Sequence, residues 1–394
     1  MWRLIRNEAL KLIKSKKFII LCFVLIAVFI YANISVIKDI ESLNPEIKRV
    51  RNSEMITKLS RQLETDKKLS KEDKLNVENQ IKKLTEENIA LTEEMMASVK
   101  DWRKNTEKKI QTLKEQKKDI DALTNNSVME NLNAQIMKLQ YYLDNDMAPE
   151  KDYKIYSFSA MLKIMETIST LLIPVFIVFL SADVISGEYS NSTIKVLLSK
   201  PVSRKKIVIS KYLTHCLIII SIIVLAETAN FLFLGLKFEF GKIKNPVVAG
   251  TQYVYNSNKN MCEALLNSSY LWSSGKALVS SAGLQLLFIA ALVALVLLIS
   301  IIVTNNVSSL IISFVLIVIV SLGTFLIPEQ AFRNIYPLLL TTYSNAPILI
   351  TGQIVNIVNN PIVNMKMGII AMGIYMLFSL LLSMIIFSKK DVLI

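Results

Sequence analysis

The sequence contains very little cysteine and histidine, with three cysteines and one histidine among 394 residues. Cys22 and Cys216 fall in or beside apolar runs and Cys262 in a polar stretch, so no disulfide framework is expected. His215 stands alone, and no Cys and His spacing predicts a zinc site. We therefore expect no metal centre, and we interpret His215 as a residue near the end of a span, with a proton-transfer role as the alternative.

Motifs for catalysis are also missing. The Gly-Lys pairs, Gly241-Lys242 and Gly275-Lys276, are followed by Ile and Ala, so neither belongs to the phosphate-binding loop G-x-x-x-x-G-K-[S/T]. Neither G-x-S-x-G nor H-E-x-x-H occurs. We expect no catalytic residue and no cofactor on this chain. The net charge of +13 comes without a groove-reading or base-stacking motif, so no nucleic-acid partner is expected.

Glycine is absent before Gly187, and between residues 38 and 161 proline occurs only at Pro45 and Pro149. A charged stretch without helix breakers favours long helices. Two apolar stripes run through it at helical spacing, namely Val77, Ile81, Leu84, Leu91 and Met95, and then Met129, Leu132, Ile136, Leu139 and Leu143. The sequence therefore predicts an extracellular helical or coiled-coil domain over residues 38–161, serving as a solvated spacer or as a gate for a substrate or partner.

The point at which this domain reverses direction is not fixed by the sequence. Capping boxes are predicted at Ser70 with Asp73 and at Ser127 with Glu130. A helix continuous from Ser70 to Ile120 would reach roughly 75 Å at 1.5 Å per residue.

Apolar runs long enough to cross a bilayer predict an all-α membrane protein with six transmembrane helices. The spans are expected at residues 18–37, 162–182, 212–236, 277–303, 310–327 and 368–387. A kink is expected at Pro174, residues 237–276 are expected to form a polar outer loop, and a tight turn follows the fourth span. Residues 328–366 are apolar but interrupted by proline and glycine, which predicts short re-entrant helices.

Residues 1–17 place apolar side chains at helical spacing among six basic ones, which predicts an amphipathic helix on the inner membrane surface. A signal peptide is the alternative, but no small-x-small cleavage site follows the first span. With both termini cytoplasmic, all strongly basic segments lie on one side, as the positive-inside rule requires. We expect a multi-pass protein of the cell membrane, and of a bacterial plasma membrane in particular.

The loop over residues 183–211 connects the second and third spans and is strongly basic. Gly187 is expected to end the preceding helix, and a short helix over residues 194–199 is expected to start at Asn191, Ser192 or Thr193. Pro201 then ends that helix, and Ser203 caps the next one. The loop is either an ordinary positive-inside connection or a helix that receives a push from a cytosolic partner.

The loop resembles the coupling helix of permease subunits of type-2 ABC exporters. The residues that match this pattern are Gly187, Glu188, Thr193, Leu197, Leu198, Pro201, Val202, Ser203, Arg204 and Lys211. Ser192 departs from it, because the family usually has glycine before the threonine. The resemblance implies that a separate ATPase subunit, which carries ATP and Mg²⁺, docks on this loop and that two permease chains assemble. We expect Leu197 and Leu198 to face that ATPase, flanked by Lys195, Lys200 and Arg204.

Two other functions remain open from the sequence. One is a mechanotransmitting ABC permease, which has a large outer domain but four spans. The other is a membrane scaffold or chain-length regulator, which places a coiled coil between two spans and needs no ATPase. Glu227 is a separate candidate, because a carboxylate inside a span is costly unless it faces protein or water. It either lines a path for ions or polar substrate or satisfies a neighbouring helix.

Overall fold

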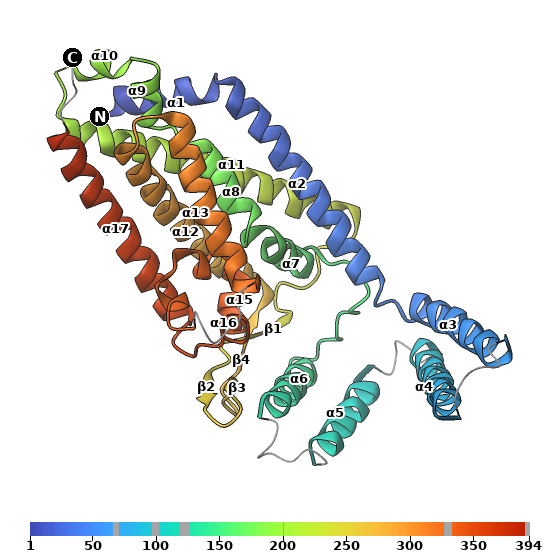
Figure 1. Cartoon of the computed structure of the whole chain (residues 1–394). Coiled ribbons are helices and arrows are strands. Elements are labelled where there is room, and N and C mark those ends of the chain that lie inside the picture. Colours follow the sequence, from blue (N-terminus) through green and yellow to red (C-terminus); the bar gives the residue numbers. More distant parts are fainter. Residues whose placement is uncertain (66–70, 97–101, 119–125, 200, 327–332, 391–394) are drawn as a thin grey trace.

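The computed structural model describes residues 1–65, 71–96, 102–118, 126–199, 201–326 and 333–390. Long helices form one bundle, with both termini at one end and small strands and a helical insertion towards the other (Figure 1). We call the end that carries α1 (Trp2–Ile13) and α10 (Ile194–Leu198) the terminal face. The hydrophobic core is continuous through the bundle and reaches the loop that carries α10.

Within the part of the chain that the structure describes, five stretches are long and apolar enough to cross a membrane. They are α2 (Lys16–Glu41), α8 (Leu172–Ser181) with α9 (Ser186–Ser190), α11 (Arg204–Lys237), α12 (Ser274–Ile302) and α17 (Met365–Lys389). The predicted fifth span corresponds to α13 (Asn306–Leu326), which starts after a short turn from α12. Its described apolar part, Asn306–Ser321, is shorter than a full span, so five of the six predicted spans meet the length criterion within the described residues.

The second span is divided, which corrects the prediction of one helix kinked at Pro174. α7 (Ser157–Ser169) and α8 are separated at Thr170 and Leu171. Pro174 instead lies in the first turn of α8, where a missing backbone N–H breaks no intrahelical hydrogen bond. The bundle buries much of α7, including Ala160, Ile164 and Ile168.

The N-terminal segment is helical over Trp2–Ile13, which is shorter than the predicted residues 1–17. α1 packs along α11, where the Thr214 hydroxyl lies 3.5 Å from the backbone oxygen of Ile5. Ser15 then caps α2, because its hydroxyl accepts a hydrogen bond of 3.1 Å from the backbone N–H of Phe18. Ser15 therefore starts α2 directly after the turn from α1.

The insertion between α2 and α7 consists of two helical hairpins (Figure 1). The first pairs α3 (Pro45–Thr65) with α4 (Lys71–Met96), and the second pairs α5 (Trp102–Lys118) with α6 (Asn126–Asp144). α4 and α5 are distinct helices, so the described residues form hairpins and not the long continuous helix whose reach was considered above. Ser70 and Ile120 themselves lie outside the described residues. Of the first stripe, Leu91 is buried whereas Met95 is exposed.

The fold is mostly helical, in agreement with the predicted all-α membrane protein, but residues 237–276 contain four short strands where a polar loop was predicted. β1 (Pro246–Ala249) pairs antiparallel with β4 (Tyr270–Ser273), and β2 (Tyr253–Asn256) pairs antiparallel with β3 (Met261–Ala264). Valine and aromatic residues favour these strands. Asn260 and Asn267 adopt positive φ angles of 51° and 58° at the turns. We call the four strands and the turns between them the β layer.

The predicted re-entrant region forms short helices, as expected from its prolines. They are η2 (Tyr336–Leu338), η3 (Leu340–Tyr343), α15 (Ala346–Thr351) and α16 (Ile354–Val358). The chain after β1 lies directly against α15, and the backbone N–H of Gly250 donates to the Ile350 oxygen at 2.8 Å. Gly352 has a φ of 87°, and a Cβ there would lie 2.2 Å from the Thr251 oxygen, so only glycine fits.

Candidate functional site at the terminal face

The loop between α8 and α11 folds back twice within a few residues. Gly187 lies inside α9 and does not end a helix, which corrects the prediction. The reversal occurs instead at Ser192, whose φ of 56° lies in the left-handed region. Thr193 precedes α10, but its hydroxyl donates to the Glu188 carboxylate and caps no helix. Ser203 likewise precedes α11 without a side-chain cap.

Serine side chains fasten this loop to the ends of α12 and α13. The Ser300 hydroxyl of α12 accepts hydrogen bonds of 3.0 Å from the backbone N–H groups of Ile185 and Ser186. The Ser309 hydroxyl of α13 donates to the Ala182 oxygen at 2.6 Å. All of these hydroxyls are buried, so the hydrogen bonds satisfy backbone groups that water does not reach.

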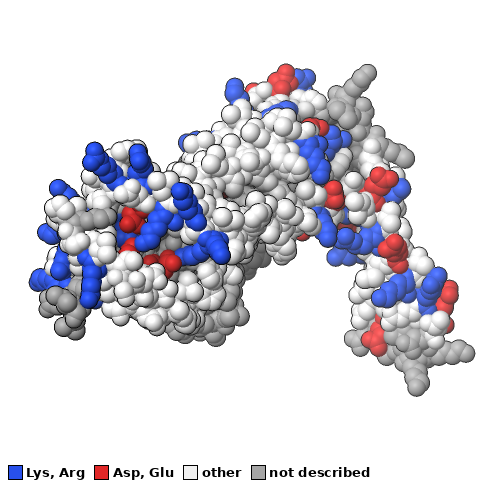
Figure 2. Space-filling model, turned by 90° about the horizontal axis from the view of Figure 1, so that it is seen from above, with Lys and Arg blue, Asp and Glu red and all other residues white. Residues whose placement is uncertain are grey.

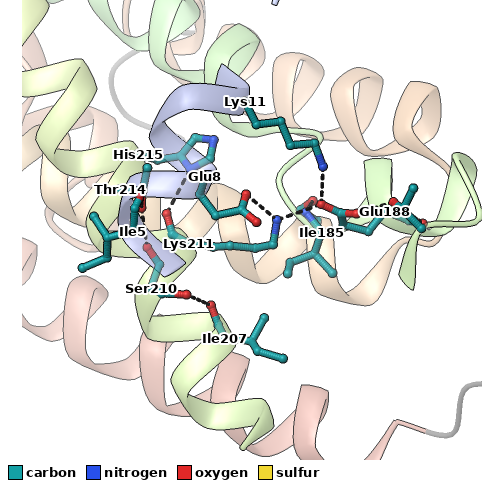
Figure 3. A network of polar contacts seen from close by, with 12 residues as sticks. Ile5, Glu8, Lys11, Ile185, Glu188, Ile207, Ser210, Lys211, Thr214 and His215 are labelled. Atoms are coloured by element: carbon teal, nitrogen blue, oxygen red, sulfur yellow. Dashed lines mark hydrogen bonds and ion pairs between the residues drawn. The ribbon is translucent and has the colours of Figure 1, made fainter. Parts of the chain in front are cut away.

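Glu188 is the centre of an ion-pair network that joins three elements (Figure 3). Its Oε1 lies 2.5 Å from Lys11 Nζ of α1 and 3.0 Å from Lys211 Nζ of α11. Lys211 also pairs with Glu8 of α1 at 2.9 Å. The Glu188 and Lys211 side chains are only 5% and 2% exposed, and buried charges of this kind need such partners. We call Glu8, Lys11, Glu188 and Lys211 the buried ion-pair network.

The ion pairs also change the pKa of Lys11, which is the exposed residue of the network. Burial disfavours the charged form of Lys11, but its hydrogen bond and ion pair with Glu188 outweigh burial and raise the pKa of Lys11. Beside the network, His215 is buried, and its Nδ1 lies 2.9 Å from the Lys211 oxygen. Because a carbonyl only accepts, Nδ1 must carry the hydrogen there.

Two basic side chains cap helix C-termini at this face. The Arg204 guanidinium donates to the backbone oxygens of Phe387, Ser388 and Lys390 at the end of α17, at 3.4, 3.3 and 2.7 Å. The Lys390 ammonium in turn donates to the Ile301 oxygen of α12 at 2.5 Å. Cations are stabilised at such positions by the unpaired carbonyls of the last turn. Arg204 is therefore a half-buried capping residue.

The exposed side of α10 differs from the prediction. Leu197 belongs to the core at 9% exposure, and Leu198 is half-buried, so the expectation that both face a partner is wrong. α10 instead exposes Lys195, Ser199 and Val196, the last at 65% exposure. Lys and Arg side chains surround a small group of acidic ones on the terminal face, seen from above at the left of Figure 2. Lys200 lies outside the described residues.

The other predicted site residue lies elsewhere. Glu227 is a buried residue of α11, ten residues from the end of α11 at Lys237 and remote in sequence from α10. The structure thus brings Glu188, Thr193 and Lys211 together but does not add Glu227 to them. Sequence reasoning missed Glu8 and Lys11 as members of the network, because their partners Lys211 and Glu188 lie far away in the sequence.

A family model described as "ABC-2 family transporter protein" matches residues 2–392. The chain belongs to the ABC-2 transporter family. A search of curated proteins found no match. Family membership and the spanning helices together make this chain a multi-pass permease of an ABC transporter, a membrane transport component that is not itself catalytic.

The backbone at Ser192 fits the resemblance described above. The positive φ of Ser192 is a conformation that glycine adopts at no steric cost, and glycine is the residue that the resemblance leads one to expect at this position.

Proposed function

We propose that this permease is the export subunit of an ABC transporter and that a separate ATPase chain docks on α10. The observation that supports this most directly is that α10 is exposed on one side and held on the other by Ile194 and Leu197 in the core, while Thr193 before it donates to Glu188 of the buried ion-pair network. ATP and Mg²⁺ would bind to the ATPase, and two permease chains would form the path for the substrate. The terminal face would then be cytoplasmic, and the membrane that of a bacterial cell.

The exposed side of α10 defines the partner's chemistry. Val196 is an apolar side chain that a shallow groove can cover, and Lys195 stands beside it. Acidic groups at the rim of an ATPase groove would complement this charge and speed association. Leu197 supports docking indirectly, because it holds α10 against the core.

The contacts of Glu188 suggest how docking would move the permease. A push on α10 reaches α1 through Lys11 and α11 through Lys211. It reaches α12 through Ser300 and α17 through Arg204. Because these bonds are buried or cap helix ends, the helices would shift as one unit and carry the movement through the membrane.

The two alternatives fit the described helices less well. A mechanotransmitting permease needs four spans and a chain-length regulator needs two, whereas five helices here are long and apolar enough. The helical insertion between α2 and α7 is compatible with all three functions, so the span count favours the exporter.

Docking is tested by co-expressing the chain with candidate ABC ATPase chains from the same organism and co-purifying them. Val196→Asp places a charge at the centre of the proposed interface, and losing a buried apolar anchor costs about 2 kcal/mol, or roughly 30-fold in affinity. Val254→Asp, an equally exposed valine of β2 at 57%, is the matched control and should bind normally. Full ATPase binding by Val196→Asp, at normal abundance, would refute docking on α10.

A further inference from the structure

Several buried polar atoms inside the bundle have no hydrogen-bond partner. Among the described residues they include Glu227 Oε1 of α11, both the Nε2 and Oε1 atoms of Gln285 of α12, and the Ser281 hydroxyl of α12. Gln285 is 2% exposed and Ser281 is fully buried. A buried polar group without a partner costs roughly 1–3 kcal/mol, and bilayer lipid offers none, so a cluster of them calls for an explanation.

Two of these side chains, Glu227 and Gln285, lie beside each other, and Ser281 lies on the same helix as Gln285. The Gln285 amide lies beside the Glu227 carboxyl group, although no hydrogen bond of normal geometry joins them. Ser281 precedes Gln285 by one helical turn and so shares its face of α12. Glu227 lies ten residues before the end of α11, and Gln285 lies eleven residues after the start of α12. At 1.5 Å per residue, both side chains are about 15 Å from the same end of the bundle.

A second polar layer closes the cluster on the side of α2. Asn33 Nδ2 donates to Asn230 Oδ1 at 2.6 Å, and Asn230 lies three residues after Glu227 on α11. Asn33 Oδ1 is buried and also lacks a partner among the described residues. The polar atoms thus come from α2, α11 and α12, which pack together with α7.

The buried polar atoms without a hydrogen-bond partner indicate the kind of ligand that would bind between them. Carboxylate, amide and hydroxyl oxygens are hard ligands, which bind alkali and alkaline-earth cations and protons. Only one of the groups is charged, so a single positive charge neutralises the site, whereas a divalent ion would leave a buried excess charge. On α2, α7 and α12, the charged side chains closest along the chain to this buried polar cluster are all exposed. They are Lys38, Asp39, Lys163, Glu166 and Lys276.

We propose that Glu227, Gln285 and Ser281 form an intramembrane site for one monovalent cation. The shared chemistry is a single positive charge held by oxygen ligands, and its source is an alkali metal ion or a proton. The site does not depend on docking of an ATPase, because all of its ligands belong to this chain. Its occupation would couple α11 to α12 in the middle of the permease.

The test is thermal unfolding of the purified full chain in Na⁺, K⁺ or N-methylglucamine chloride at equal ionic strength, repeated across a pH series. A cation in large excess over its Kd should raise the Tm by about 3 °C or more. Glu227→Gln should abolish that increase, and Glu166→Gln, the same change at an exposed carboxylate of α7, should retain it. If the source is a proton, the salts act alike and Glu227→Gln removes part of the pH dependence instead.

Gln285→Leu separates ligand binding from a structural role and remains available if Glu227→Gln fails to fold. It removes two unpartnered atoms, so without alkali cations it should be at least as stable as the wild type, yet respond less to them. Identical responses of the wild type, Glu227→Gln and Gln285→Leu to salts and to pH would overturn the proposal.

Discussion

Lys211 and Glu188 form an ion pair of 3.0 Å in which both side chains are almost completely buried. Glu188→Gln should therefore destabilise the chain by about 3 kcal/mol, because Lys211 keeps only Glu8 as a charged partner and cannot replace Glu188 with water. Thermal unfolding of the purified chain measures this. Lys11→Gln is the matched control, since the Lys11 side chain is 61% exposed and its loss should cost less than about 1 kcal/mol. Equal losses from the two variants would contradict the central role of the buried pair.

Ser192→Gly should stabilise the loop, because a left-handed backbone costs a non-glycine residue roughly 1–2 kcal/mol. Part of that gain is offset by the greater freedom of glycine in the unfolded chain, so a net gain of about 0.5 kcal/mol is expected. Ser199→Gly is the control, since Ser199 has a φ of −71° and gains nothing from glycine. Unfolding temperatures that rise equally in both variants would show that the turn is not strained.

Contact between α6 and the β layer should depend on pH through Glu130. This carboxylate is 2% exposed and accepts hydrogen bonds from the backbone N–H groups of Asn267 and Ser269, at 2.6 and 2.9 Å. Burial raises its pKa, but the hydrogen bonds to Ser269 and Asn267 outweigh burial and lower it. A depressed carboxyl pKa contributes stability that is complete above the unfolded value of about 4.3 and is lost as pH falls through the folded value.

Protection of the backbone N–H groups of residues 126–144 against hydrogen exchange, taken relative to the intrinsic exchange rate at each pH, should consequently fall below about pH 4.3 in the wild type. Glu130→Gln should exchange faster at neutral pH and lose most of this acid dependence. Glu115→Gln, at an exposed carboxylate of α5, should behave like the wild type. An unchanged acid dependence in Glu130→Gln would assign the effect to other carboxylates.

The proposed orientation makes a labelling prediction. In right-side-out vesicles, an impermeant thiol reagent should label Lys108→Cys of α5 but not Lys205→Cys of α11, both of which are exposed. A background without Cys22, Cys216 and Cys262 is needed. Labelling of Lys205→Cys alone would invert the orientation.

The long helices could be predicted from the sequence, because the length of an apolar run and the charges beside it depend only on neighbouring residues. The hairpins of the insertion follow from its stripes, but their reversal points carry no glycine or proline and were not predicted. The capping box at Ser127 and Glu130 proved to be a docking contact, in which the Ala264 N–H donates to the Ser127 hydroxyl at 3.0 Å. Asp73 is described, but its proposed partner Ser70 is not.

Several residues of the site could be identified from the sequence, but the contacts between them could not. Glu188 and Lys211 were identified from the resemblance, whereas Lys11 lies 177 positions from Glu188, and no spacing rule reaches that far. The side of α10 that faces outward was also misassigned, because Leu197 and Val196 are equally apolar and only packing decides which is buried. The four strands are too short for periodicity to separate them from a loop.

The α3–α4 hairpin has a further consequence. Its two helices pack on each other and make few contacts with the rest of the described chain, whereas α6 is held by the β layer. Such a unit can be gained, shortened or exchanged in evolution without rebuilding the membrane bundle. Differences in length among relatives of this permease should therefore concentrate between α2 and α5.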